Sequence, residues 1–354
     1  MLFPYKYIHH DMEKMQKYMD YIFYSVWLKA HKLGDFDEDL FNDNQKLKNI
    51  IKAFNFLPSS PDWGKYFLER VKNIFDIFKT FNTYELKKIK RWYQANNNIE
   101  KLCNGHLKPI LYKDLKFFNA TLSKELSKLY SKLYDKKIIG LKDIKDNIGS
   151  SIESHYKDFM TTNSREICPF CGLHTMKGIH HTKREAYDHY LPKGKYPFNS
   201  INFKNLAPMC HECNSSYKLE NNPIFDKSNN RRKAFYPYSY MDSDIQIEVV
   251  LSAKNLSQIT KPNITINFLS KNIDEVNTWD KLFGIKERYK AVCLGTSDGK
   301  EWLTQVLDDW KQIGKTTTEY MDLLKIQSIR EPFNEKRFIK KPFLEACQSV
   351  GIIS

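Results

Sequence analysis

No apolar stretch in this sequence is long enough to cross a bilayer. The opening residues, MLFPYKYIHHDMEKMQ, lack the basic start, the apolar run and the small-residue cleavage site of a secretory signal. Internal repeats, low-complexity tracts and coiled-coil heptads are also absent. We therefore expect a soluble, cytoplasmic protein without a membrane partner.

Cysteine is scarce, and its number is odd: the chain has seven. In a reducing compartment such a number excludes a disulfide framework, and paired CxxC units are better interpreted as thiolate metal ligands. Cys103, Cys293 and Cys347 have no such pairing and are expected to be buried small hydrophobic residues.

Acidic residues are outnumbered, with 42 Asp and Glu against 56 Lys and Arg, so the formal net charge is +14. A positive surface favours a polyanionic partner, because each neutralised phosphate releases counterions. The alternative is a chain that is merely rich in lysine, and charge by itself does not separate the two.

Material for packed cores is ample, at 41% hydrophobic residues with 23 Phe, 21 Tyr and 6 Trp. The length of 354 residues predicts two or three domains. Changes in composition divide the chain into a helical basic region at 1–160, a region rich in Cys, His, Pro and Asn at 161–235, and a mixed region at 236–354.

Helical periodicity dominates the first region. Apolar residues from Met12 to Trp27 predict one long amphipathic helix over 11–32, and three or four helices should follow between Lys65 and about Ser150, one beginning after Pro61. The stretch between Lys65 and about Ser150 has more basic than acidic residues. This excess suits a helix face that follows a phosphate backbone, and the alternative is a lysine-rich face that is only solvated. The apolar stripe over 11–32 is expected in the core, with docking on another protein as the alternative.

The third region begins with two segments of alternating hydrophobicity, at 245–253 and 264–270, which predict strands. Helices are expected over 272–292, 300–313 and 317–329. The predicted fold class is therefore α+β.

Four cysteines in the central region have the spacing of a metal site. Cys168 with Cys171, and Cys210 with Cys213, form two CxxC knuckles that can supply four thiolates to a tetrahedral Zn²⁺. A closed shell of four thiolates has no open position for a substrate, so this zinc should be structural.

The segment between the knuckles contains adjacent Asp188 and His189 and then Asn205, and Asn214 follows the last cysteine. Each has an ordinary explanation, since a lone His is often a surface residue and a lone Asn is often a helix cap. Together, framed by two CxxC knuckles, they indicate a catalytic centre. Hydrolysis needs a base with a pKa near neutrality and a Lewis acid, which a histidine and a metal ion held by oxygen ligands can supply.

At these residues the chain resembles the HNH endonucleases, in which a hairpin and a helix surround one divalent cation in a ββα-metal fold. Asp188-His189 matches the "DH" step, Asn205 the Asn of "NLxPxC", and Asn214 the terminal position of "CxxCNxxxK". The resemblance implies that His189 is the general base and that Asn205 orients it. It also implies that Asp188 and Asn214 bind the catalytic cation.

One departure from the family concerns the last position, where many members have His and this chain has Asn214. Two oxygen donors favour Mg²⁺ or Mn²⁺ as the catalytic ion. His211, inside the second knuckle, is expected to face DNA or to support the ligands. His180 and His181 are expected on the first strand, with at most one pointing at the groove.

Five basic residues near this centre are expected to contact nucleic acid, a solvated loop being the alternative for the arginines: Lys193, Lys195, Lys218, Arg231 and Arg232. The function predicted from the resemblance is a metal-dependent endonuclease that cuts DNA. The alternative is a zinc-stabilised nucleic-acid-binding adaptor without catalysis. The flanking regions resemble those of stand-alone bacterial HNH proteins, some of them similar to antiphage effectors that work with a companion ATPase.

Overall fold

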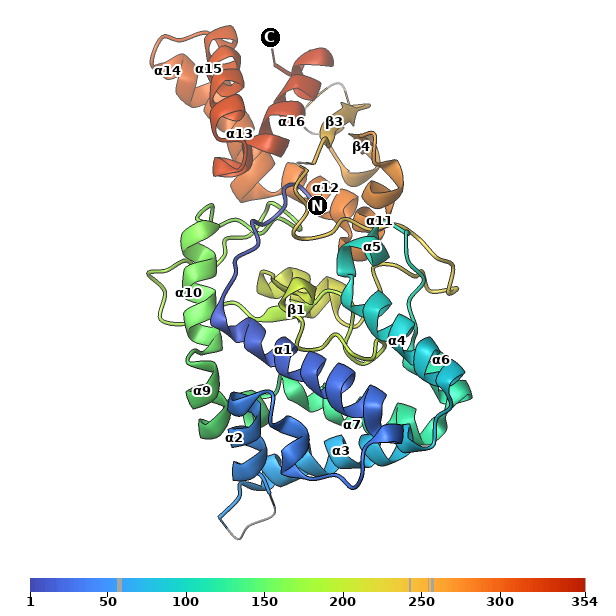
Figure 1. Ribbon diagram of the computed structural model, residues 1–354. Coiled ribbons are helices and arrows are strands. Elements are labelled where there is room, and N and C mark those ends of the chain that lie inside the picture. Colours follow the sequence, from blue (N-terminus) through green and yellow to red (C-terminus); the bar gives the residue numbers. More distant parts are fainter. Residues whose placement is uncertain (56–58, 242, 254, 256–257, 354) are drawn as a thin grey trace.

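The protein is described by a computed structural model that covers residues 1–55, 59–241, 243–253, 255 and 258–353. Helices dominate, and the strands in these ranges form two small antiparallel sheets. The α+β class predicted from the sequence is thus confirmed. In Figure 1 the N-terminal helices form the lower part of the molecule, the β1 hairpin lies in the middle, and the C-terminal elements lie above it.

The stretch at 11–32 is helical but not one regular helix. It consists of the 3-10 turn η1 (Asp11–Glu13), α1 (Lys14–Tyr21), the π-helical η2 (Ile22–Val26) and the 3-10 segment η3 (Trp27–Lys32). Most of its apolar residues, including Met15, Phe23 and Trp27, are buried in the core of this same chain. The alternative of a free docking face on this stretch is therefore wrong.

Between Asp62 and Ile148 the chain forms more and shorter helices than the three or four expected. The reason is local, because Asn82, Asn98 and Asn119 each cap a new helix by accepting a hydrogen bond from a backbone N–H of its first turn. The α-helices of this half are α2 (Gln45–Ala53), α3 (Asp62–Lys79), α4 (Thr83–Asn97), α5 (Ile99–Cys103), α6 (Tyr112–Phe118), α7 (Ala120–Leu133), α8 (Lys136–Ile139), α9 (Lys142–Ile148) and α10 (Ile152–Thr162).

The central region holds a short hairpin followed by a helical turn. Strand β1 (Tyr187–His189) pairs antiparallel with β2 (Leu206–Pro208), so that Asp188 lies opposite Ala207. The 3-10 turn η5 (Phe203–Asn205) leads into β2, and the π-helical segment η6 (Cys213–Lys218) follows it. His180 and His181 precede β1 in an exposed loop, so their expected place on the first strand is wrong.

The C-terminal region begins with the two predicted strands, β3 (Gln246–Leu251) and β4 (Ile264–Leu269), which are paired antiparallel. Val249 and Ile266 face each other on the buried side of this ladder, as the alternation predicts. The α-helices that follow are α11 (Ile273–Phe283), α12 (Ile285–Leu294), α13 (Glu301–Thr304), α14 (Trp310–Gln312), α15 (Thr317–Arg330) and α16 (Arg337–Ser349). Gly284, in the left-handed conformation, separates α11 from α12 in the stretch where one helix was expected. Helix α16 was not predicted.

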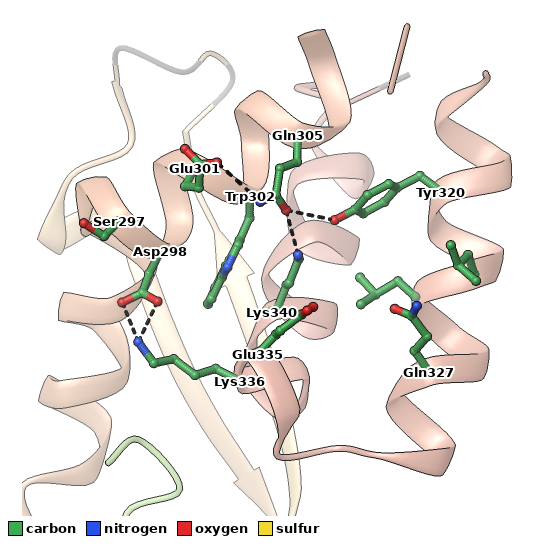
Figure 2. Close-up of a pocket in the computed structure, with 12 residues that line it drawn as sticks. Ser297, Asp298, Glu301, Trp302, Gln305, Tyr320, Gln327, Glu335, Lys336 and Lys340 are labelled. Atoms are coloured by element: carbon green, nitrogen blue, oxygen red, sulfur yellow. Dashed lines mark hydrogen bonds and ion pairs between the residues drawn. The ribbon is translucent and has the colours of Figure 1, made fainter. Parts of the chain in front are cut away.

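A polar cavity of about 520 Å³ lies among these C-terminal helices (Figure 2). Inside it the Oε1 atom of Gln305 accepts hydrogen bonds from Lys340 at 2.9 Å and from Tyr320 at 3.4 Å. Asp298 binds Lys336 at its edge. No residue of the predicted nuclease site lines this cavity.

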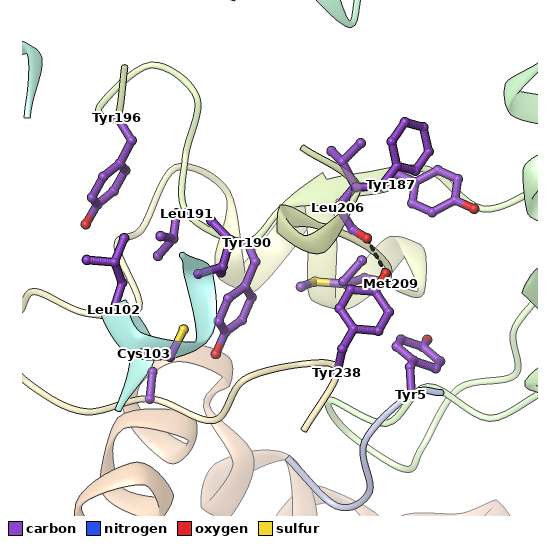
Figure 3. Packing of buried hydrophobic residues seen from close by; sticks show 14 of the residues in the cluster. Tyr5, Leu102, Cys103, Tyr187, Tyr190, Leu191, Tyr196, Leu206, Met209 and Tyr238 are labelled. Carbon is purple, nitrogen blue, oxygen red and sulfur yellow. Dashed lines mark hydrogen bonds between the residues drawn. The ribbon is translucent and has the colours of Figure 1, made fainter. Parts of the chain in front are cut away.

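One continuous cluster of buried apolar residues runs through all three sequence regions. Figure 3 shows Tyr5, Leu102 and Tyr238 packed around the hairpin residues Tyr190 and Met209. The hydroxyl of Tyr5 donates to the carbonyl of Pro208 at 2.9 Å, which ties the N-terminal segment to β2. Packing thus crosses both predicted domain boundaries, and the division into three domains stays a prediction.

Candidate functional site

The four paired cysteines meet in the interior. Their Sγ atoms all lie within 4.8 Å of one another, and the Cys171 and Cys210 sulfurs are 3.9 Å apart. Tetrahedral Zn–S bonds of about 2.3 Å require sulfurs that are about 3.8 Å apart, so this buried cluster could hold a metal such as zinc. The other three cysteines are also buried, away from the cluster, as expected.

The first knuckle depends on a glycine. Gly172 follows Cys171 with a φ of +70°, and its N–H donates to the Cys168 carbonyl at 2.8 Å. A Cβ at this position would lie 2.5 Å from a methyl carbon of Leu2 and 2.8 Å from the ring of Phe338. The tight turn that brings the two thiols together therefore excludes a larger residue here.

Helix α12 supplies a charged partner to the cluster. Arg288 donates from Nη1 to the Cys213 sulfur at 3.4 Å, and its guanidinium lies 4.4 Å from the centre of the Tyr217 ring. Burial opposes the charge of Arg288, but the sulfurs of Cys213 and Cys171 outweigh it and raise the pKa of the guanidinium. A buried arginine thus offsets part of the negative charge that four thiolates would carry.

Two aromatic residues of the C-terminal helices hold the backbone of the first knuckle. Trp279 Nε1 donates to the Phe170 carbonyl at 2.6 Å, and the Tyr289 hydroxyl donates to the Cys171 carbonyl at 2.9 Å. Sequence reasoning missed Arg288, Trp279 and Tyr289 as supports of the metal cluster. They lie within WDKLFGIKERY, a segment whose amphipathic pattern predicts a helix but does not indicate what the helix contacts.

His189, the predicted base, is half-buried at the end of β1. Its Nε2 lies 2.8 Å from the carbonyl oxygen of Ser200. A carbonyl can only accept, so Nε2 carries the hydrogen and Nδ1 of the neutral ring keeps the lone pair. Tyr134, just after α7, packs against the imidazole edge-on, with ring centres 5.1 Å apart. The ring is held in one tautomer with Nδ1 as its basic atom.

The environment keeps this imidazole neutral. The pKa of His189 is lowered to about 3, chiefly by burial and also by the positive charges of Lys193 and Lys218, while the hydrogen bond to Ser200 opposes the shift. The expectation of a pKa near neutrality is therefore wrong for the protein without substrate. His189 can accept a proton at neutral pH but is a weak base until a negative charge approaches.

Asp188 points to the opposite face of the hairpin strand and is almost fully buried. Its Oδ2 atom lies 2.8 Å from the ammonium nitrogen of Lys218, whose side chain has no exposed surface. The same ammonium donates to the His189 carbonyl at 3.0 Å. Burial nevertheless raises the pKa of Asp188 above its usual value, with Lys218 opposing the shift. Lys218 was expected to contact a phosphate, and its burial corrects that expectation.

The arrangement does not fit the expected Mg²⁺ or Mn²⁺ site. The carboxylate of Asp188 already has a cationic partner, the ammonium of Lys218 at 2.8 Å. Asp188 is therefore not free to bind a divalent ion in this arrangement.

Asn205 lies in the loop between the strands and is fully buried. Its Oδ1 accepts from the Leu191 N–H at 2.8 Å, and its Nδ2 donates to the Leu191 carbonyl at 2.9 Å. Its own carbonyl accepts from the N–H of Tyr190. These three bonds attach the loop to the two residues that follow His189, so Asn205 is placed to fix the direction of that strand end.

The remaining predicted nucleic-acid contacts fall into two groups. Lys195 is exposed, whereas Lys193 is half-buried and donates to the Ser131 carbonyl at 3.0 Å. Arg231 donates to the Ile224 carbonyl at 2.9 Å, and Arg232 to the carbonyls of Pro223 and Asn222 at 3.0 and 2.8 Å. Both guanidinium groups thus bind backbone carbonyls and fix the loop. His211, within the second knuckle, is exposed.

Comparison with known proteins finds a distant similarity. Protein ea31 of Escherichia phage lambda is 26% identical over 196 residues, which cover 54% of this chain and 59% of the phage protein. The chain thus matches less than two thirds of the length of that relative. No family model matches the sequence, and no solved structure matches the fold. Within the described residues, no helix combines the length and apolar character needed to cross a bilayer.

Proposed function

We propose that the central hairpin is the active site of an HNH-type endonuclease that hydrolyses phosphodiester bonds of DNA. The observation that carries the proposal is the His189–Ser200 hydrogen bond, which leaves Nδ1 of a neutral imidazole as a proton acceptor. A two-stranded hairpin, a helical turn after β2 and a four-cysteine cluster frame this histidine, in the order that the resemblance implies.

In the proposed reaction His189 Nδ1 takes a proton from a water molecule. The water oxygen bonds to phosphorus, the bond from phosphorus to the 3′ oxygen breaks, and that oxygen leaves with a proton from solvent. The negative phosphate raises the low pKa of His189 at the moment when it must accept the proton. The net charge of +14 favours a nucleic acid as the source of that phosphate.

The test is nicking of a supercoiled plasmid by the wild-type protein and by His189→Ala, with and without Mg²⁺ or Mn²⁺. The matched control is His31→Ala, which removes an exposed histidine of η3, outside the central region. We expect His189→Ala to lose at least a hundredfold in rate, because general-base catalysis contributes about 10²–10⁴-fold, while its zinc content and the rate of the control stay unchanged. Equal nicking by wild type and His189→Ala would refute the proposal.

A second candidate function is a zinc-stabilised adaptor that binds nucleic acid without cutting it. The Asp188–Lys218 ion pair favours it, since that pair occupies the carboxylate that a metal-dependent nuclease would need. Tight DNA binding by a zinc-loaded protein that nicks nothing under any of these conditions would support the adaptor. The antiphage setting and the companion ATPase rest on the resemblance alone and stay predictions.

A further inference from the structure

Lys218 carries its charge in the interior, directly beside the carboxylate that the resemblance to HNH endonucleases assigns to a metal ion. Its ammonium nitrogen is 2.8 Å from Asp188 Oδ2 and 3.0 Å from the His189 carbonyl oxygen. The Lys218 side chain has no exposed surface, and that of Asp188 is 8% exposed. A buried ammonium is tolerated only when it is paired and hydrogen-bonded, and both conditions hold here.

The backbone explains how this lysine reaches β1. Residues Cys213–Lys218 form the π-helical segment η6, whose widened turn begins at the last zinc-knuckle cysteine and ends at Lys218. The second knuckle therefore anchors one end of η6, and the Asp188–Lys218 contact anchors the other. The lysine is thus placed by the same fold that assembles the cysteine cluster.

A divalent ion and this ammonium compete for one position. Mg²⁺ binds a carboxylate oxygen at about 2.1 Å, so an ion on Asp188 would lie within a few ångströms of the Lys218 nitrogen. The two like charges would repel in a buried site, where solvent screening is weak. A divalent ion could bind Asp188 strongly only if Lys218 gave up both of its contacts and moved.

We propose that Lys218 takes the place of the divalent cation at Asp188, so that the site has an internal positive charge and no high-affinity ion of its own. The inference deepens the proposed function. Its catalytic half, that DNA cleavage does not depend on an ion held by Asp188, rests on that function. Its binding half does not, because ion affinity is measurable whether or not the protein cuts DNA.

The experiment is a Mn²⁺ titration of the zinc-loaded full-length protein. Electron paramagnetic resonance measures the concentration of free Mn²⁺ at each step. We expect wild type to bind Mn²⁺ weakly and Lys218→Met to bind one equivalent at least tenfold more tightly, since it frees the carboxylate. The gain should disappear in the double variant Asp188→Asn with Lys218→Met. Lys193→Met is the matched control, because Lys193 donates only to a backbone carbonyl, and it should leave the Mn²⁺ affinity unchanged.

Zinc content and the melting temperature show whether each variant is folded, and Lys218→Ala offers a second way to vacate the position. If both lysine variants unfold, the Mn²⁺ affinities of wild type and Asp188→Asn are compared instead. Weak binding that is equal in these two proteins supports the proposal. One equivalent bound tightly by wild type and lost in Asp188→Asn overturns it.

Nicking assays separate this inference from the proposed function. We expect wild type from which free divalent ions have been removed, with zinc retained, to nick DNA within about threefold of its rate in Mg²⁺. A loss of more than tenfold that Mg²⁺ restores in wild type, and does not restore in Asp188→Asn, would overturn the catalytic half. If no condition gives nicking, the proposed function fails while the Mn²⁺ titration still decides what Lys218 does.

Discussion

Arg288 Nη1 lies 3.4 Å from the sulfur of Cys213, although 75 residues separate them in the chain. The contact joins helix α12 to the second CxxC knuckle, and Trp279 of α11 and Tyr289 of α12 bind the backbone of the first knuckle. The C-terminal region is therefore part of the support of the cysteine cluster, and removing it should release metal.

Replacing a single ligand tests the cysteine cluster. We expect Cys213→Ala to reduce bound zinc from about one equivalent to a small fraction and to unfold the central region, because binding of a structural metal is coupled to folding. Cys103→Ala is the matched control, since Cys103 is buried outside the cluster and should keep the metal. Metal analysis of the purified proteins measures the difference, and full zinc in Cys213→Ala would contradict the assignment.

Replacing Arg288 tests the charged support. Arg288→Met should lower the free energy of unfolding by roughly 2 kcal/mol, the usual range for a hydrogen bond to a charged partner, and should accelerate transfer of zinc to a chelator. The control is Lys290→Met on the same helix, whose ammonium lies 3.9 Å from Glu287 near the surface and should contribute little. If the two variants lose zinc at the same rate, the Arg288 contact is unimportant.

Asn205→Ala removes both hydrogen bonds to Leu191 and leaves a buried N–H and a buried carbonyl without partners. We expect a loss of about 2–4 kcal/mol in stability, since each unsatisfied buried group costs about 1–3 kcal/mol. Urea denaturation of the zinc-loaded protein measures it. Asn221→Ala, in which an exposed amide loses a local bond to the Tyr217 carbonyl, should cost less than about 0.5 kcal/mol. A similar loss in both variants would contradict this account.

His155 gives the protein a specific sensitivity to acid. Burial, and to a lesser degree the charges of His10 and Arg184, lower the pKa of His155 to about 3. Its Nε2 is buried without a partner in the described residues, and its Nδ1 bonds the Tyr187 hydroxyl. Between pH 6.5 and 3 the unfolded chain binds a proton there that the folded chain does not. Stability must therefore fall as the pH drops through this window and be insensitive to His155 above it.

His155→Phe should remove this contribution. Relative to wild type, the variant should gain roughly 3 kcal/mol when the pH is lowered from 7 to 4, because each pH unit below 6.5 is worth about 1.4 kcal/mol. The loss of the Tyr187 contact lowers stability by the same amount at every pH and cancels from this comparison. Denaturation curves at pH 7, 5.5 and 4 provide the measurement, and a constant difference between the two proteins would refute the assignment.

The local patterns predicted local structure well. The segments at 245–253 and 264–270, whose alternation predicted strands, contain β3 and β4. The helix predicted after Pro61 is α3. Predicted helix boundaries were wrong where a capping side chain begins a new helix or where the helix geometry changes within a segment. The asparagine caps divided the basic stretch into short helices, and a π-helical segment interrupted the helix over 11–32.

By itself the sequence determined the α+β class, the CxxC spacing and the order of Asp188, His189, Asn205 and Asn214 within and just after a hairpin. These features depend on residues close together in the chain, where hydrophobic period and ligand spacing are visible. Tertiary structure alone decided that Arg288 supports the thiolates, that Ser200 orients His189 and that Lys218, not a surface cation, neutralises Asp188. Such pairings depend on which buried charges and polar atoms the fold brings together, because water no longer satisfies them there, and the periodicity of the sequence does not carry that information.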